Sequence, residues 1–279
     1  MAPVVALIVT GDPTVQDFKV FVKTLEVWHP DAQAYIFTDS ETKDKLLEVK
    51  SRITINLKVC LDAYAGLTRS DMEARESKSY DSLWTEFMYQ KAEVLKWAFA
   101  TSGAKGIWFN DADIVHAAPL PHIPDGTQIA LSQHFIRAGD EARFGKFNGG
   151  YFWIADQTLL DVWVGAAGKS RFYEQAALED VAAAAKALYR FPPQVNFGWW
   201  RMYQGAEPPP AIQAKFSINR TDRSIGLRYD GQPVQSFHSH MFDKGTGANG
   251  VFNQWLDAFT GRFAGAHPPL RVWRKSVGF

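Results

Sequence analysis

Residues 106–115 read GIWFNDADIV, a short apolar run that leads directly into two aspartates, Asp111 and Asp113. Residues 106–109 have the length and the apolar character of a buried strand. Side chains two residues apart in an extended chain point the same way. We therefore expect both carboxylates at the carboxyl end of a central strand, which is where open α/β sheets place their ligands.

This pair of carboxylates is a candidate cation site. Two neighbouring carboxylates repel each other unless a cation lies between them. Hard divalent ions prefer such oxygens and share their remaining positions with phosphates. On this motif alone, a solvated acidic turn after the strand stays open as the alternative.

Strands and helices alternate upstream of the two aspartates. Residues 61–81 interrupt the alternation, because they are polar, have no clear period and are expected to form a long connection. The βαβ pattern of the other segments predicts an α/β fold with a largely parallel sheet. Strands are expected at residues 4–9, 34–37 and 53–59, and helices at residues 14–28, 41–49 and 82–100.

The downstream half continues without a domain linker, and we expect one domain over residues 1–279. A polar loop is expected at residues 134–146. Pro192 and Pro193 are expected to end the second of two helices in the middle of this half. Strands are expected at residues 129–132, 147–154 and 234–237, and helices at residues 157–167, 173–189 and 249–259.

Composition excludes several classes of protein. Thirty basic and thirty acidic residues cancel, which argues against a nucleic-acid binder. The one cysteine, Cys60, excludes an internal disulfide framework and a Cys-rich zinc site, and we expect it to be a small buried apolar residue. The apolar run at residues 3–10 lacks the flanks of a targeting signal, and no stretch is long enough to span a membrane. We expect a soluble, cytoplasmic protein.

A second polar cluster follows the strand expected at residues 234–237. His238 ends that strand and could present its imidazole to a metal. Lys244, six residues further on, could meet a phosphate as a point charge. His240 could share a face with His238, although a paired-histidine zinc site has no visible third ligand. An ordinary surface histidine is the plain alternative for each imidazole.

Two further motifs carry polar side chains. Asn148 offers a donor and an acceptor, and Gly149 and Gly150 would allow the backbone to approach a ligand closely. A plain turn is the alternative. Glu179 and Asp180 lie in an expected helix, where adjacent residues point about 100° apart. At most one of these two acids would therefore face a site, and solvated surface acids are the alternative.

Together these motifs resemble the metal-dependent glycosyltransferases of GT-A fold. The likeness is to the GT8 family of glycogenin and galactosyltransferase-like enzymes and to the related nucleotide-diphospho-sugar transferase family. Residues 107–115 resemble their hydrophobic-DxD-hydrophobic segment, and residues 147–154 their Asn-Ala-Gly strand, with Gly149 replacing alanine. His238 and Lys244 keep the spacing of the family's His-x-x-Gly-x-x-Lys motif, although methionine stands at the glycine position and the following Pro-Trp is absent.

The resemblance implies a GT-A, Rossmann-like α/β fold with a mixed, mostly parallel sheet flanked by helices. Residues 1–115 would hold the nucleotide, and residues 116–279 would shape the sugar and acceptor sites. The implied reaction transfers a sugar from a nucleotide-diphosphate donor, a UDP-sugar in this family, to a hydroxyl of a glycan or other acceptor, with retention of configuration. Mn²⁺ or Mg²⁺ would be the metal cofactor of this transfer.

The resemblance also implies roles for individual residues. Asp111, Asp113 and His238 would be the metal ligands. The diphosphate would lie near Lys91 and Lys244, the nucleoside near Thr10 and Asp12, and the donor sugar near Asn148, Gly149 and one catalytic acid, Asp180 or Glu179.

Two other function classes remain. A sugar-nucleotide pyrophosphorylase of related fold should carry a Gly-rich nucleotidyl loop with basic residues after its first strand, and residues 10–13 read TGDP. A non-catalytic carbohydrate-binding protein would explain the ten tryptophans. Such a protein would not require His238 and Lys244 at the family spacing with the two aspartates upstream.

Overall fold

A computed structural model describes residues 2–221 and 224–279 of the chain. Its main sheet has seven strands in the order β3-β2-β1-β4-β7-β6-β8. The strands β1 to β4 pair in parallel, whereas β7 runs antiparallel to both of its neighbours. This mixed, mostly parallel sheet confirms the expected α/β class. The strands are Val4–Ile8 (β1), Gln33–Thr38 (β2), Thr54–Val59 (β3), Ile107–Asn110 (β4), Ile129–Gln133 (β6), Phe147–Ile154 (β7) and Leu188–Arg190 (β8).

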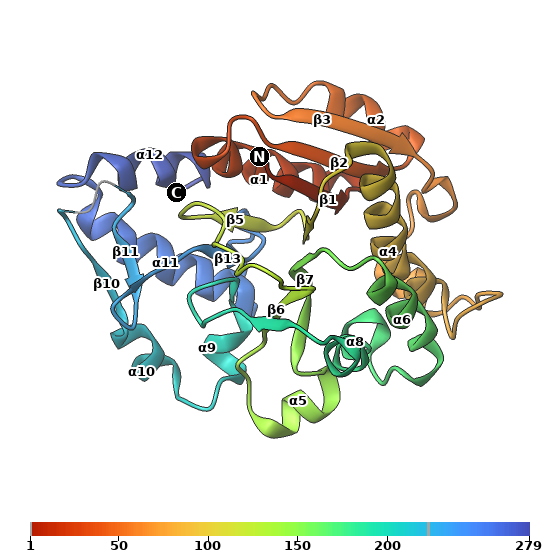
Figure 1. Ribbon diagram of the computed structural model, residues 1–279. Coiled ribbons are helices and arrows are strands. Elements are labelled where there is room, and N and C mark those ends of the chain that lie inside the picture. Colours follow the sequence, from red (N-terminus) through yellow and green to blue (C-terminus); the bar gives the residue numbers. More distant parts are fainter. Residues whose placement is uncertain (1, 222–223) are drawn as a thin grey trace.

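Helices cover both faces of this sheet, because its central strands are apolar on both sides. Alternate residues of β1 enter two different core clusters, with Val4 and Ala6 in one and Val5 and Leu7 in the other. Leu83–Ser102 (α4), Thr158–Gly165 (α6) and Leu178–Ala184 (α8) pack on the first face, and Gly11–Trp28 (α1) and Ser40–Leu47 (α2) on the second. Figure 1 shows α4, α6 and α8 together at one side of the molecule.

A small second sheet brings the two halves of the sequence together at the carboxyl end of β4. It consists of Ile114–His116 (β5), Ser236–His238 (β13) and Phe197–Gly198 (β9), in the order β5-β13-β9. His238 pairs with Ile114 on one side and with Gly198 on the other. This register places His238 next to the Asp-x-Asp segment, which lies between β4 and β5.

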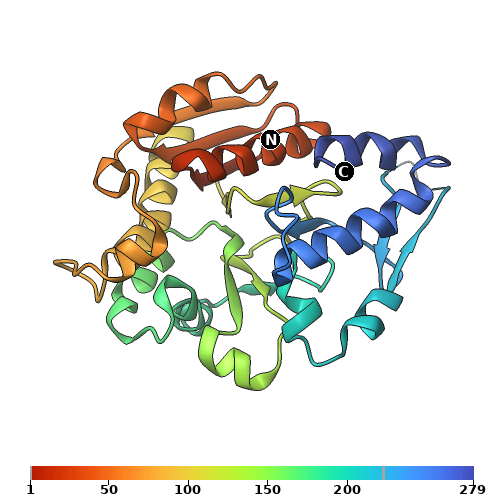
Figure 2. The same cartoon turned by 180° about the vertical axis from the view of Figure 1, so that it is seen from behind.

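The C-terminal part of the chain forms a third, aromatic cluster. Phe197, Phe216, Phe237, Phe252 and Trp273 are buried in it, which gives many of the aromatic residues an ordinary packing role. Figure 2 shows the last of the blue C-terminal helices beside the red helix α1. The elements are Trp200–Gln204 (α9), Pro209–Ala214 (α10), Phe216–Ile218 (β10), Leu227–Tyr229 (β11), Gln232–Pro233 (β12), Ala248–Ala264 (α11) and Pro268–Ser276 (α12).

Several expected elements differ in the structure. The loop expected at residues 134–146 contains the helix Ala138–Phe144 (α5), and residues 61–81 contain a turn of 3₁₀ helix, Asp62–Tyr64 (η1), and the short helix Arg69–Glu73 (α3). The helix expected at residues 173–189 is two short helices, Tyr173–Ala176 (α7) and α8, followed by β8. Residues 188–190 pair with β6 at the sheet edge, so the helix ends at Ala184, in the alanine-rich run and well before the two prolines.

In the described part of the chain, no helix is both long enough and apolar enough to cross a membrane.

Candidate metal and donor site

Asp111, Asp113 and His238 converge at the carboxyl end of β4. One ligand atom from each residue lies within 4.8 Å of the other two, and among residues 2–221 and 224–279 this is the one group of three that could hold a metal ion. His238 Nε2 lies 3.1 Å from Asp113 Oδ1 and 3.8 Å from Asp111 Oδ2. Two carboxylates and one imidazole fit a divalent cation such as Mn²⁺ or Mg²⁺.

The surroundings of Asp113 favour its ionised form. Burial by itself would raise the pKa of this carboxyl, but the imidazoles of His238 and His240 outweigh burial and lower the pKa well below its usual range. His240 bonds through Nδ1 to Asp17 Oδ2 at 2.7 Å, and this bond raises the pKa of His240 to about 9. The cluster therefore offers charged oxygens to a cation at neutral pH.

Lys91 lies beneath the cluster as a buried counter-ion. From α4 it donates to Glu174 Oε1 (2.7 Å) and to the Gly149 carbonyl (3.1 Å), and its Nζ lies 3.3 Å from Asp111 Oδ1. Burial opposes its charge, yet Asp111 and Glu174 outweigh burial and raise the pKa of Lys91. Lys91 is thus a cation that orients Asp111, and it also lines the cleft described below.

Gly149 and Gly150 make room for the site's own side chains. A Cβ on Gly150 would lie 2.2 Å from Asp111 Oδ2 and 2.5 Å from His238 Cε1. A Cβ on Gly149 would lie 2.7 Å from Glu174 Oε1. The sequence predicts that a ligand approaches the backbone closely at these glycines. In the structure, side chains of the protein itself make this close approach.

A cleft of about 1070 Å³ opens over the cluster. It is large enough for a nucleotide-sized ligand. Segments from both halves of the sequence line it, including α3 and α5 from the two connections. The sequence-predicted residues that line it are Thr10, Lys91, Asp111, Asp113, Asn148 and His238.

Four predicted residues lie elsewhere. Asp12 pairs with Lys45 at the surface, and the Lys244 ammonium lies 4.2 Å from the centre of the Phe279 ring. Glu179 is held by Arg171 at 2.8 Å, and Asp180 is exposed. None of the four is among the residues that line the cleft. The structure therefore does not bring Asp12, Lys244, Glu179 or Asp180 to the predicted site, because local pairing and helix phase turn these side chains away from it.

Comparison with known proteins gives a fold and no family. No protein-family model matches the chain, and no curated protein matches it. An active-site glutamine-to-glutamate mutant of LgtC, a GT8 galactosyltransferase, matches with a TM-score of 0.51 at 12% identity, over 91% of this chain and 95% of that one. The chain has the GT-A fold. The bifunctional glycosyltransferase WbbM, in its apo form, gives a TM-score of 0.48 at 11% identity, over 71% of this chain and 40% of that one.

Within this GT-A fold, the cleft contains polar residues that the sequence did not single out. Gln175 lies beside Asn148 and Gly149, and its Oε1 accepts from the Gly149 N–H at 3.1 Å. Asp17 is buried next to His240. Neither residue belongs to a motif. The signal for Asp17 is its place on the predicted helix at residues 14–28, and the signal for Gln175 is its place near the start of the helix predicted at residues 173–189. Neither signal gives the direction of the side chain.

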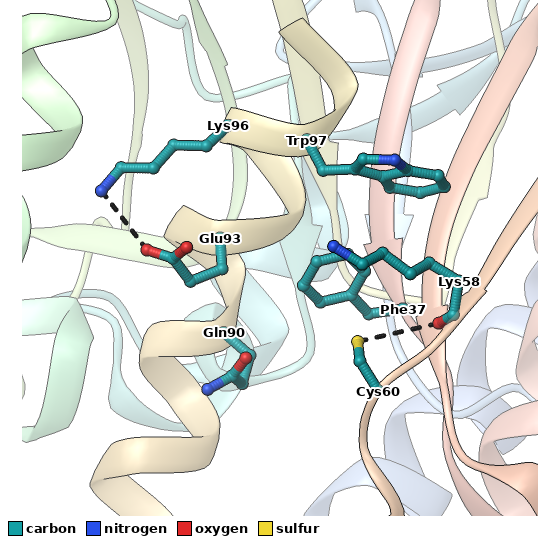
Figure 3. Close-up of a pocket in the computed structure, with 7 residues that line it drawn as sticks. All are labelled: Phe37, Lys58, Cys60, Gln90, Glu93, Lys96 and Trp97. Carbon is teal, nitrogen blue, oxygen red and sulfur yellow. Dashed lines mark hydrogen bonds and ion pairs between the residues drawn. The ribbon is translucent and has the colours of Figure 1, made fainter. Parts of the chain in front are cut away.

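A second hollow of about 340 Å³ lies between α4 and the ends of β2 and β3 (Figure 3). Phe37, Lys58 and Trp97 line it, with the Lys58 ammonium 5.2 Å from the centre of the Phe37 ring. Cys60 also lines this hollow and is exposed. The expectation that Cys60 is buried is wrong, because Cys60 follows β3, a strand at the edge of the sheet.

Proposed function

We propose that this chain is a metal-dependent glycosyltransferase that moves a sugar from a nucleotide-diphosphate donor, a UDP-sugar, to a hydroxyl of a glycan or similar acceptor, with retention of configuration. The observation that carries the proposal is the convergence of Asp111, Asp113 and His238 in a cleft of about 1070 Å³ on a GT-A fold.

The metal ligands in this proposal are Asp111, Asp113 and His238. A bound Mn²⁺ or Mg²⁺ supplies Lewis-acid stabilisation of the charge that grows on the departing nucleoside diphosphate. Lys91 holds Asp111 in place by a buried ion pair. The protein's part is thus to present two ionised carboxylates in a fixed arrangement, so that little reorganisation is needed during the reaction.

The other cleft residues divide the donor between them. Thr10 follows β1, Asp17 lies on α1, and both residues line the cleft. We place the nucleoside beside them. Asn148 and Gln175 lie together beside Gly149, whose carbonyl accepts from Lys91, and their amides suit the hydroxyl groups of the donor sugar. We place the acceptor against the aromatic side chains that line the rest of the cleft, among them Trp84. In this scheme residues 1–279 act as one domain, with the nucleotide in residues 1–115.

Calorimetric titration with UDP tests the nucleotide and metal parts of the proposal. UDP is expected to bind the wild-type protein in the presence of Mn²⁺ and to lose most of its affinity after chelation. Asp113→Asn should bind UDP weakly under both conditions. Asp125→Asn is the matched control, because Asp125 is exposed in a turn away from the cleft. UDP affinity that is the same with chelator, and the same in Asp113→Asn, contradicts the proposal.

A further inference from the structure

Asn196 is a buried amide behind His238 to which the proposed function gives no role. Its side chain is fully buried, and its backbone is in the left-handed region at φ 54°. Its N–H donates to Ser236 Oγ at 2.9 Å, which ties it to the strand that carries His238. A non-glycine residue in this conformation costs about 1 kcal/mol or more, so the surroundings must hold it there.

Arg201 supplies that support. This buried guanidinium lies behind the segment that leads to Asn196 and donates to the Val195 carbonyl at 3.3 Å. It also donates to the carbonyls of Gln133, His134 and Pro193. The four bonds fix the backbone at residues 133–134 and 193–195, and they allow the strained conformation of Asn196 to persist.

A chain of hydrogen bonds sets which way the Asn196 amide points. The Gly150 N–H can only donate, and it donates to Asn148 Oδ1 at 3.0 Å. The Asn196 atom that lies 3.0 Å from the same oxygen must then be Nδ2. Nδ2 also donates to Ser132 Oγ at 3.1 Å. The remaining atom, Asn196 Oδ1, therefore faces His238 Nδ1 at 3.1 Å.

The orientation of the amide determines the tautomer of His238. An amide oxygen can only accept, so the proton between it and the imidazole must be carried by His238 Nδ1. His238 Nε2 is the nitrogen that faces Asp113 Oδ1, at 3.1 Å. The chain of hydrogen bonds thus runs from the Gly150 N–H on β7 to the His238 imidazole on β13.

From this geometry we infer that Asn196 is a positioning residue for the metal site. It keeps the proton on His238 Nδ1, so that in the metal-bound protein His238 is the Nδ1–H tautomer and Nε2 is the nitrogen that binds the divalent ion. The inference rests on the proposed function, because it assigns a purpose to the tautomer only where a metal binds. Partners of this kind orient metal-binding histidines and raise their basicity, and their loss typically costs 10–100-fold in metal affinity.

Three variants test the inference by Mn²⁺ affinity, measured by electron paramagnetic resonance. Asn196→Gly removes the acceptor and leaves the left-handed backbone without strain. It is expected to weaken Mn²⁺ binding by at least about tenfold. Asn196→Asp keeps an acceptor for Nδ1 but loses the Nδ2 donor to Asn148 and Ser132, and it should bind Mn²⁺ more tightly than Asn196→Gly. Asp230→Gly is the matched control, since Asp230 is an exposed residue with φ 51° outside the cleft, and it should bind Mn²⁺ like wild type.

Nitrogen-15 NMR of the histidines in the wild-type protein needs no variant. His238 should show a hydrogen-bonded proton on Nδ1 in the metal-free protein and in the diamagnetic Mg²⁺ form. A proton on Nε2 with Nδ1 bare in the Mg²⁺ form overturns the inference, and so does Asn196→Gly that binds Mn²⁺ as tightly as wild type. A wild-type protein that keeps the Nδ1 proton but binds no Mn²⁺ contradicts the proposed function instead.

Discussion

The amide of Gln175 connects two segments of the cleft wall. Its Oε1 accepts from the Gly149 N–H, and its Nε2 donates to the Phe144 carbonyl at 2.9 Å. Gln175→Ala removes both bonds beside the proposed sugar position. Displacement of a reacting group by about 1 Å can cost about 10²-fold in rate, and we expect a fall in kcat of that order with a smaller change in UDP affinity.

The exposed acid Asp180 gives the control for that experiment. Asp180→Asn should turn over like wild type, because Asp180 is outside the cleft. Steady-state kinetics on both variants decides whether the donor sugar lies beside Gln175 or beside Asp180. A large loss of kcat in Asp180→Asn, with Gln175→Ala unaffected, would place the sugar on the α8 side and contradict this assignment.

Gly150 allows a steric test of the metal site. Gly150→Ala would place a Cβ 2.2 Å from Asp111 Oδ2, so this carboxylate must move. We expect Mn²⁺ affinity to fall by at least about tenfold, the size of effect seen when the support of a metal ligand is lost. Gly139→Ala on α5 meets nothing within 4 Å and should bind Mn²⁺ normally. Equal affinities for Mn²⁺ in both variants would contradict the site geometry.

At the scale of elements, the buried Lys91 joins α4 to Asp111, which follows β4, and to Glu174 on α7. Lys91→Met removes the cation and leaves Glu174 buried without its partner. Breaking a buried ion pair in this way costs about 3–5 kcal/mol, and urea unfolding should show a loss of that size. Lys96→Met on the same helix breaks only surface pairs and should cost less than about 1 kcal/mol. Similar losses of unfolding free energy in the two variants would show that the ion pair of Lys91 contributes little to stability.

The same elements show what sequence patterns can predict. The apolar run of β4 and the alternation of strands and helices around it predict the sheet, and the spacing of Asp111 and Asp113 predicts their common direction. The short strands β8 and β9 have no such pattern, because pairing across the fold creates them. Asn196 and Gln175 are missed for the same reason: the backbone turns that aim their side chains depend on tertiary contacts.

At the scale of the whole molecule, the cleft is bounded by two connections that are far apart in the sequence. Arg69 on α3 and Arg143 on α5 both line it. Leu61, Tyr64 and Met72 anchor residues 61–81 in the core, whereas helix α5 in residues 134–146 has no buried residue, so ligand contacts should stabilise residues 134–146 in particular. Hydrogen exchange with UDP and Mn²⁺ should show new protection in at least one of the two segments. Unchanged exchange in both would contradict closure over the donor.

The most direct test of the central claim is release of UDP from a panel of UDP-sugars by the metal-loaded protein. We expect release with at least one sugar in Mn²⁺, loss of that activity on chelation, and recovery when Mn²⁺ is restored. Asp113→Asn should be inactive under all three conditions, and Asp125→Asn should behave like wild type. Turnover that survives complete chelation, or that survives in Asp113→Asn, would contradict the claim that this is a metal-dependent glycosyltransferase.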